Sequence, residues 1–205
     1  MIRNVVLDMG NVMLDYSPER YLRTWVEREE DRALLRRELF DSVEWAMTDH
    51  GTLDNAGLCR AVCSRVPERL HAAVGTIITH WCEDMPALPG IAEVIAQLLD
   101  EGYHLYVLSN VGQDYPTMRK NIPHLDRFSG EFTSSQVRLL KPEPAIFTAF
   151  CERFGLLPEE CLFVDDQKNN AYGAMRIGMH GLAYHGDPQT IPDKIKEING
   201  GCRHE

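Results

Sequence analysis

Short hydrophobic runs alternate along the chain with segments of helical period. The runs lie at 4–7 (NVVL), 104–108 (HLYVL), 161–164 (CLFV) and 181–184 (GLAY), and a shorter candidate (GEF) lies at 130–132. Hydrophobic residues at intervals of three and four predict an amphipathic helix over 91–99, ended by Gly102. Further helices are expected over 147–154 and 168–177. Strands that alternate with helices predict crossover connections and a parallel α/β sheet.

Residues 16–86 interrupt this alternation, because strand patterns are scarce among them. Ser17 followed by Pro18 predicts the start of a helix, and Asp54 predicts the N-cap of another. Pro86 and Pro89 mark the predicted end of this segment. We therefore expect an α/β protein with a Rossmann-like parallel-sheet core, formed by residues 1–15 and 87–205, and an inserted α-helical cap, formed by residues 16–86.

Polar residues follow three of the predicted strands at the points where the strands end. They are Asp8, then Ser109 with Asn110, then Asp165 with Asp166. In open parallel sheets, ligands bind at the carboxyl ends of the strands. Each of these residues has a plainer explanation as a helix cap or a turn residue, and Lys141 alone is compatible with an ordinary solvated lysine. Their order and placement together favour a functional site.

These residues resemble the four motifs of the haloacid dehalogenase-like hydrolase superfamily, and the resemblance spans essentially the whole chain. It is closest to a phosphatase branch that includes the α-D-glucose-1-phosphate phosphatases. That branch shares a D-x-G-N-V opening, an S-N, a K-P-E and an F-x-D-D followed by N. Here these motifs lie at 8–12, 109–110, 141–143 and 163–166, and TIPD at 190–193 is similar too.

The resemblance implies a Mg²⁺-dependent phosphatase that acts on a small phosphate monoester, for example a sugar phosphate such as glucose 1-phosphate. Asp8 would attack phosphorus and form an aspartyl-phosphate. Mg²⁺ would offset the repulsion between the two anions. Its implied ligands are the Asp8 carboxylate, the Gly10 backbone carbonyl and Asp166, and Asp165 would bind it through water or directly. The implied phosphate-binding groups are Asn11, Ser109, Asn110 and Lys141, of which Lys141 is also catalytic.

Gly10 departs from the pattern of most phosphatases of this superfamily, which carry an aspartate two residues after the nucleophile. That aspartate protonates the leaving alcohol and later activates water, and a positioned acid or base contributes about 10²–10⁴-fold. Three interpretations stay open. The first is a phosphatase with an easily displaced leaving group, or with a proton relayed by the substrate, a water or a cap residue.

The second interpretation is a 2-haloacid dehalogenase, which needs neither the acid nor magnesium. Dehalogenases usually lack paired aspartates such as Asp165 and Asp166, so the pair argues against it. The third is a non-catalytic binding protein of the same fold. In the cap, Trp45, His50 and Gly51 lie near a predicted helix junction and are candidates to face the site, although a buried structural tryptophan is the simpler alternative.

The composition of the chain limits the kinds of binding partner that we expect. A net charge of -10 disfavours a nucleic-acid surface and an anionic membrane, and no apolar run reaches the length of about 18 residues that a membrane span needs. The N-terminus lacks a signal-peptide pattern, and the six cysteines form no dense framework. We therefore expect a cytoplasmic monomer or weak dimer with reduced thiols, whose partner is a small phosphorylated metabolite.

Overall fold

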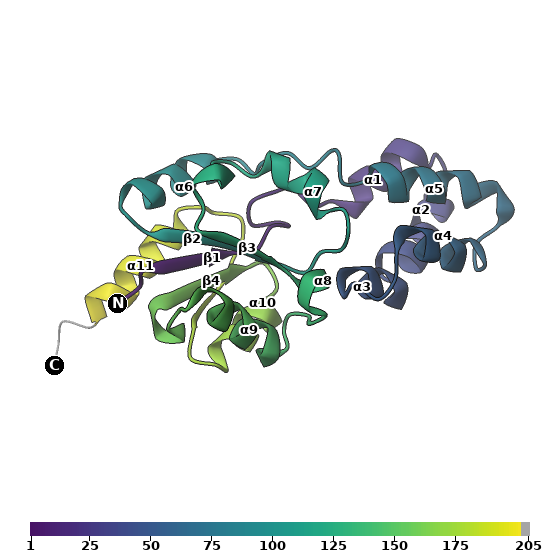
Figure 1. Ribbon diagram of the computed structural model, residues 1–205. Helices are drawn as coiled ribbons and strands as arrows, with labels where there is room; N and C mark the ends of the chain where they lie inside the picture. The colour runs from purple at the N-terminus through teal and green to yellow at the C-terminus, as the bar shows by residue number, and fades with distance from the viewer. Residues whose placement is uncertain (202–205) are drawn as a thin grey trace.

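The computed structural model describes residues 1–201 and contains a five-stranded sheet with helices on both faces (Figure 1). The strands are β1 (Asn4–Leu7), β2 (His104–Ser109), β3 (Gly130–Thr133), β4 (Cys161–Asp165) and β5 (His180–Ala183). The longer helices outside the cap are α6 (Ile91–Asp100), α9 (Pro144–Phe154), α10 (Lys168–Met175) and α11 (Thr190–Gly201), and the short ones are α7 (Tyr115–Met118), α8 (Ser134–Val137), η3 (Arg119–Asn121), η4 (Leu125–Arg127) and η5 (Pro158–Glu160).

All strand pairs are parallel, and the strand order is β3-β2-β1-β4-β5. Strand β1 is central, with Leu7 opposite Val107 on one side and Val164 on the other. Parallel strands end at the same edge of a sheet. Asp8, which follows β1, and Ser109, which ends β2, therefore meet at one edge.

Side chains of β1 alternate between two hydrophobic clusters, one on each face of the sheet. Val5 and Leu7 pack on the side covered by α6 and α11, whereas Val6 packs on the side of α9 and α10. Strands β1, β2 and β4 are almost wholly buried, whereas β3 and β5 at the two edges are partly exposed. A parallel sheet that is covered on both faces reads in sequence as a continuous apolar run, as the NVVL and CLFV runs do.

The inserted helices lie together beyond the carboxyl edge of the sheet (Figure 1). They are α1 (Pro18–Trp25), α2 (Glu29–Leu35), η1 (Arg36–Phe40), α3 (Val43–Asp49), α4 (Asn55–Cys63), η2 (Glu68–Leu70) and α5 (His71–His80). Ser17 caps α1 by accepting a hydrogen bond from the Arg20 N–H, and Asp54 caps α4 through the Gly57 N–H. We call residues 16–86 the cap. Its boundaries stay a prediction.

The two connections between core and cap run side by side. The Asp15 N–H donates to the Pro86 carbonyl, and the Leu88 N–H donates to the Met13 carbonyl, both at 2.9 Å. The chain therefore leaves the core and returns to it through paired backbone segments. The hydrophobic cluster on this side of the sheet continues into the cap.

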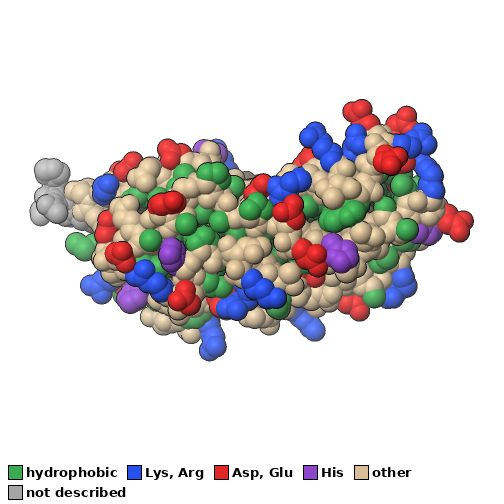
Figure 2. All heavy atoms as spheres, turned by 90° about the horizontal axis from the view of Figure 1, so that it is seen from above, with side chains coloured by type: hydrophobic (Ala, Val, Ile, Leu, Met, Phe, Trp, Pro, Cys, Tyr) green, Lys and Arg blue, Asp and Glu red, His purple; other side chains and the backbone are tan. Residues whose placement is uncertain are grey.

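The parallel α/β fold with an inserted helical segment confirms the fold expected from the sequence. Lys141 lies in the loop before α9, which begins three residues later at Pro144. The five described cysteines are free, and Cys202 lies outside the described residues. None of the described helices has the length and apolar character needed to cross a membrane. Acidic and basic side chains intermingle on the face seen in Figure 2.

Candidate active site

Asp8 is placed at the carboxyl edge because the pairing of β1 continues into it. Its N–H donates to the Val164 carbonyl at 2.9 Å. The chain then turns sharply, since the N–H groups of Met13 and Leu14 both donate to the Met9 carbonyl. Asn11 takes the left-handed conformation, with φ of 55°, that an asparagine tolerates better than most residues. The strand and the turn together hold the Asp8 side chain at 11% exposure.

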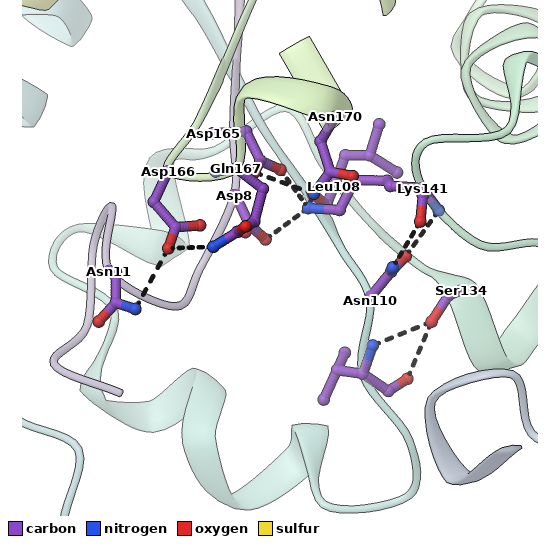
Figure 3. Close-up of polar contacts among 11 residues, drawn as sticks. Asp8, Asn11, Leu108, Asn110, Ser134, Lys141, Asp165, Asp166, Gln167 and Asn170 are labelled. Carbon is purple, nitrogen blue, oxygen red and sulfur yellow. Dashed lines mark hydrogen bonds and ion pairs between the residues drawn. The ribbon is translucent and has the colours of Figure 1, made fainter. Parts of the chain in front are cut away.

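Lys141 connects two of the aspartates. Its Nζ lies 2.8 Å from Asp8 Oδ1 and 2.7 Å from Asp165 Oδ2, and it also donates to the Leu108 carbonyl at 3.2 Å (Figure 3). The side chain is 1% exposed. Burial lowers the pKa of Lys141, but the charges of Asp8 and Asp165 outweigh it and hold the pKa above its usual value. The ammonium therefore stays charged inside the protein.

Asn110 fixes the backbone of Lys141 through a reciprocal pair of hydrogen bonds. Its Nδ2 donates to the Lys141 carbonyl at 3.0 Å, and its Oδ1 accepts from the Lys141 N–H at 2.9 Å (Figure 3). The side chain at the end of β2 thus holds the loop that carries the lysine. The sequence predicted a phosphate contact for Asn110; that contact stays a prediction and concerns its backbone N–H.

The two aspartates after β4 have different surroundings. Asp165 is fully buried, and its Oδ1 accepts from the Gln167 N–H at 2.8 Å and from Asn170 Nδ2 at 2.9 Å. Asp166 is partly exposed, and its Oδ2 accepts from Asn11 Nδ2 at 3.2 Å and from the Gln167 side chain at 3.0 Å. Asp165 is thus held by protein donors, whereas Asp166 faces the open space beside Asp8.

Three carboxylates crowd together here. Asp8, Asp165 and Asp166 each offer an oxygen within 4.8 Å of the others. Burial and the charge on Asp8 raise the pKa of Asp165 to about 6, and the same two causes raise the pKa of Asp166. One lysine cannot offset three carboxylates. A hard divalent cation such as Mg²⁺ takes carboxylate oxygens as ligands and supplies the missing charge, so this donor set fits it.

A cavity of about 450 Å³ lies over this edge and is walled by both core and cap. Its core residues include Asp8, Gly10, Asn11, Ser109, Asn110, Lys141 and Asp166. Its cap residues include Tyr16, Glu19, Arg36, Trp45, Asp49 and Trp81. The structure therefore brings every core site residue expected from the sequence to one cavity, except Asp165, which lies buried behind Lys141.

Two acidic residues of the cap that were not expected from the sequence, Glu19 and Asp49, line the cavity. Of the three cap candidates, Trp45 lines the cavity, whereas His50 and Gly51 are not among its lining residues. Asp49, the last residue of α3, lines it instead. Its position next to the His50-Gly51 turn was the only sequence signal, and the direction of its side chain depends on how the cap packs on the core.

The sequence profile of the haloacid dehalogenase-like hydrolases matches residues 2–178. The chain belongs to this family. Two of its relatives are a phosphoglycolate phosphatase of Haemophilus influenzae, 28% identical over 91% of this chain and 78% of that protein, and an (S)-2-haloacid dehalogenase of Burkholderia cepacia, 28% identical over 48% of this chain and 43% of that protein.

The fold is shared with solved haloacid dehalogenase-like structures. One is an enzyme of this family from Bacteroides thetaiotaomicron, an aspartate-to-alanine mutant in complex with magnesium and inorganic phosphate. Its TM-score to the present structure is 0.70 at 19% identity, over 91% of this chain and 95% of that chain. At this level of identity the similarity concerns the fold.

In this haloacid dehalogenase-like hydrolase, the backbone at position 10 does not require glycine. Gly10 is not among the glycines with positive φ. A Cβ built on it would lie 3.4 Å from Tyr16 Cβ, an ordinary contact. The backbone at position 10 therefore accepts a Cβ, and backbone strain does not explain the glycine.

Proposed function

We propose that the protein is a Mg²⁺-dependent phosphatase that hydrolyses small phosphate monoesters through an aspartyl-phosphate on Asp8. The observation that carries the proposal is the cluster of Asp8, Asp165 and Asp166 bridged by buried Lys141 at the floor of a cavity. A 2-haloacid dehalogenase has no use for a cation site of this kind. The relatives named as phosphatases support the same choice.

Each residue then has a distinct task. Asp8 attacks phosphorus, and the Lys141 ammonium lies within 2.8 Å of its carboxylate, where it also offsets charge on a phosphoryl oxygen. The cation would be held by the Asp8 carboxylate, the Gly10 carbonyl and Asp166, with Asp165 closing the cluster from behind. When bound, it lowers the repulsion between nucleophile and phosphate. Ser109, Asn110 and Asn11 would position the remaining phosphoryl oxygens.

The cap side of the cavity favours a neutral, polyhydroxylated leaving group such as a sugar. Arg36 lines this side, but it is already paired with Glu19 at 2.8 Å and with Asp41 at 3.0 Å. A substrate carboxylate, as in phosphoglycolate, would compete with those two carboxylates. The rings of Trp45 and Trp81, with centroids 5.0 Å apart, supply apolar surface for a sugar ring. We therefore propose glucose 1-phosphate as the leading substrate.

A panel of phosphorylated metabolites tests the proposed function. With Mg²⁺ present, we expect phosphate release from sugar 1-phosphates to exceed release from sugar 6-phosphates and from phosphoglycolate, and to stop when the metal is chelated. Phosphate is the measured product, and chloride release from 2-chloropropionate is measured in parallel. Release of chloride without metal, or no phosphate from any substrate, would contradict the proposal.

Replacing Asp166 with alanine tests the cation site. Because Asp166 is the partly exposed carboxylate of the cluster, we expect the Mg²⁺ concentration for half-maximal activity to rise by at least 10- to 100-fold, on the order of what even outer-shell changes cost. The stabilisation of the fold by Mg²⁺, measured as a shift in melting temperature, should also shrink. Exposed Asp193, replaced in the same way, serves as the control. Unchanged Mg²⁺ dependence in both measurements would remove Asp166 from the ligand set.

A further inference from the structure

We propose that Asp49 of the cap supplies the acid and base that Gly10 cannot supply. The proposal rests on the proposed phosphatase function. Displacement at phosphorus is roughly in line, so the leaving oxygen lies opposite Asp8. Asp8 is on the floor of the cavity, which is formed by the core, and the opposite wall is formed by the cap. Because position 10 of the core carries no acid, the cap side of the cavity is where a proton donor for the leaving group can lie.

Two acidic side chains of the cap line this cavity among the described residues, Glu19 and Asp49. Glu19 is committed to Arg36, whose Nη1 lies 2.8 Å from its Oε1. No hydrogen bond or ion pair within residues 1–201 engages the Asp49 carboxylate, although its backbone is held. Asp49 is thus the cap acid that is free to meet a substrate oxygen.

The backbone around Asp49 is pressed against the core. Ser134 Oγ donates to the Asp49 carbonyl at 2.5 Å. A Cβ on Gly112 would lie 2.6 Å from the Thr48 carbonyl oxygen, and a Cβ on Gly51 would lie 2.7 Å from the Ser135 carbonyl oxygen. Only glycine permits these two approaches, and Gly51 also has φ of +76°. Contacts on both sides of Asp49 therefore fix its position relative to β2 and α8, and so relative to Asp8.

The electrostatics support an acid at this point. Burial and the charge on Asp8 raise the pKa of Asp49 to about 8; Lys141 opposes this shift and Asp114 adds to it. Tyr16, the neighbour on the cavity wall, cannot take the role, because burial and Asp49 itself raise its pKa far above neutrality. At neutral pH the Asp49 carboxyl can hold a proton, and it can release that proton to an alkoxide.

The proposed reaction balances in two steps. In the first, an Asp8 carboxylate oxygen bonds to phosphorus, the bond from phosphorus to the leaving oxygen breaks, and the Asp49 proton passes to that oxygen, so that an alcohol leaves. In the second, water takes the place of the alcohol and gives a proton to the Asp49 carboxylate. The oxygen of the water bonds to phosphorus, and the bond between phosphorus and Asp8 breaks. Inorganic phosphate leaves, and free Asp8 and protonated Asp49 are restored.

The experiment compares leaving groups in the Asp49→Asn protein. With glucose 6-phosphate, whose alkoxide needs a proton, we expect kcat/KM to fall by about 100-fold or more. With p-nitrophenyl phosphate, whose phenolate leaves without one, it should change by less than about fivefold. Asp49→Glu should restore part of the glucose 6-phosphate rate. Glu44→Gln, on the same helix but paired with Arg65 away from the cavity, is the matched control and should resemble the wild type with both substrates.

The Gly10→Asp replacement gives a second test of the proposal, because the backbone at position 10 accepts a Cβ. Placed in the Asp49→Asn protein, it should recover the glucose 6-phosphate rate by at least about tenfold. An equal loss with both substrates, or no loss with glucose 6-phosphate, would overturn the assignment of Asp49. If the wild-type protein hydrolyses neither substrate, the phosphatase proposal fails instead, so the two failures are distinguishable.

Discussion

Replacing Asp8 with asparagine should lower kcat by on the order of 10⁴- to 10⁶-fold, as removal of a covalent nucleophile does in other hydrolases. The amide that results is a poor nucleophile and a weaker cation ligand. The surroundings would change little, because asparagine has nearly the same shape and Asp8 is held by the backbone of β1. Steady-state phosphate release in the presence of Mg²⁺ measures the loss.

The same variant should fold at least as stably as the wild type in the absence of metal. Three carboxylates within 4.8 Å repel one another, and asparagine removes one of the three charges. The melting temperature without Mg²⁺ should therefore stay level or rise, while activity is lost. A parallel replacement of exposed Asp100 serves as the control. Activity within tenfold of the wild type would refute Asp8 as the nucleophile.

Covalent trapping gives an independent measurement of the same role. Rapid quenching of wild-type protein with a ³²P-labelled substrate should leave label on the chain, and the Asp8→Asn protein should carry none. An aspartyl-phosphate is an acyl phosphate, so hydroxylamine should release the label. Label that survives the Asp8→Asn replacement would place the covalent step on another residue.

The sheet and its functional edge could be predicted from the sequence because both depend on local patterns. A buried parallel strand is a short apolar run, and the residue after it must lie at the carboxyl edge; this places Asp8, Ser109 and Asp165 with no knowledge of side-chain packing. Helix α11 is absent from the sequence-based expectation, although Ile191, Ile195 and Ile198 follow a helical period. Helix α8 has only four residues, too few to show a period.

The facing of cap residues could not be predicted, because it is set by contacts between segments far apart in the chain. Asp49 lines the cavity as a result of how α3 meets Ser134 and Gly112, which lie more than 60 residues away. The same limit applies to the different surroundings of Asp165 and Asp166. The resemblance gives Asp166 as a ligand and leaves open whether Asp165 binds directly or through water. The position of Lys141 shows that Asp165 is enclosed, whereas Asp166 lines the cavity.

Replacing Lys141 with methionine should cost both activity and stability. Its ammonium lies within 2.8 Å of two carboxylates that are almost completely shielded from water. Removing one partner of a buried ion pair leaves unpaired charge inside and costs about 3–5 kcal/mol. We therefore expect a large drop in the free energy of unfolding without metal, and a fall in kcat of about 10²–10³-fold or more with Mg²⁺, as when an oxyanion-stabilising group is lost.

The loss of stability should depend on the remaining charges. Mg²⁺ should restore part of the stability of the Lys141→Met protein, because the cation balances the negative charges of Asp8 and Asp165 in place of the lysine. A second replacement, Asp165→Asn, should restore part of it without metal and should not restore kcat. The control is Lys168→Met, an exposed lysine stacked on Tyr172, which should change the free energy of unfolding by no more than about 0.5 kcal/mol. Equal stability of the Lys141→Met and wild-type proteins would show that the lysine does not neutralise the cluster.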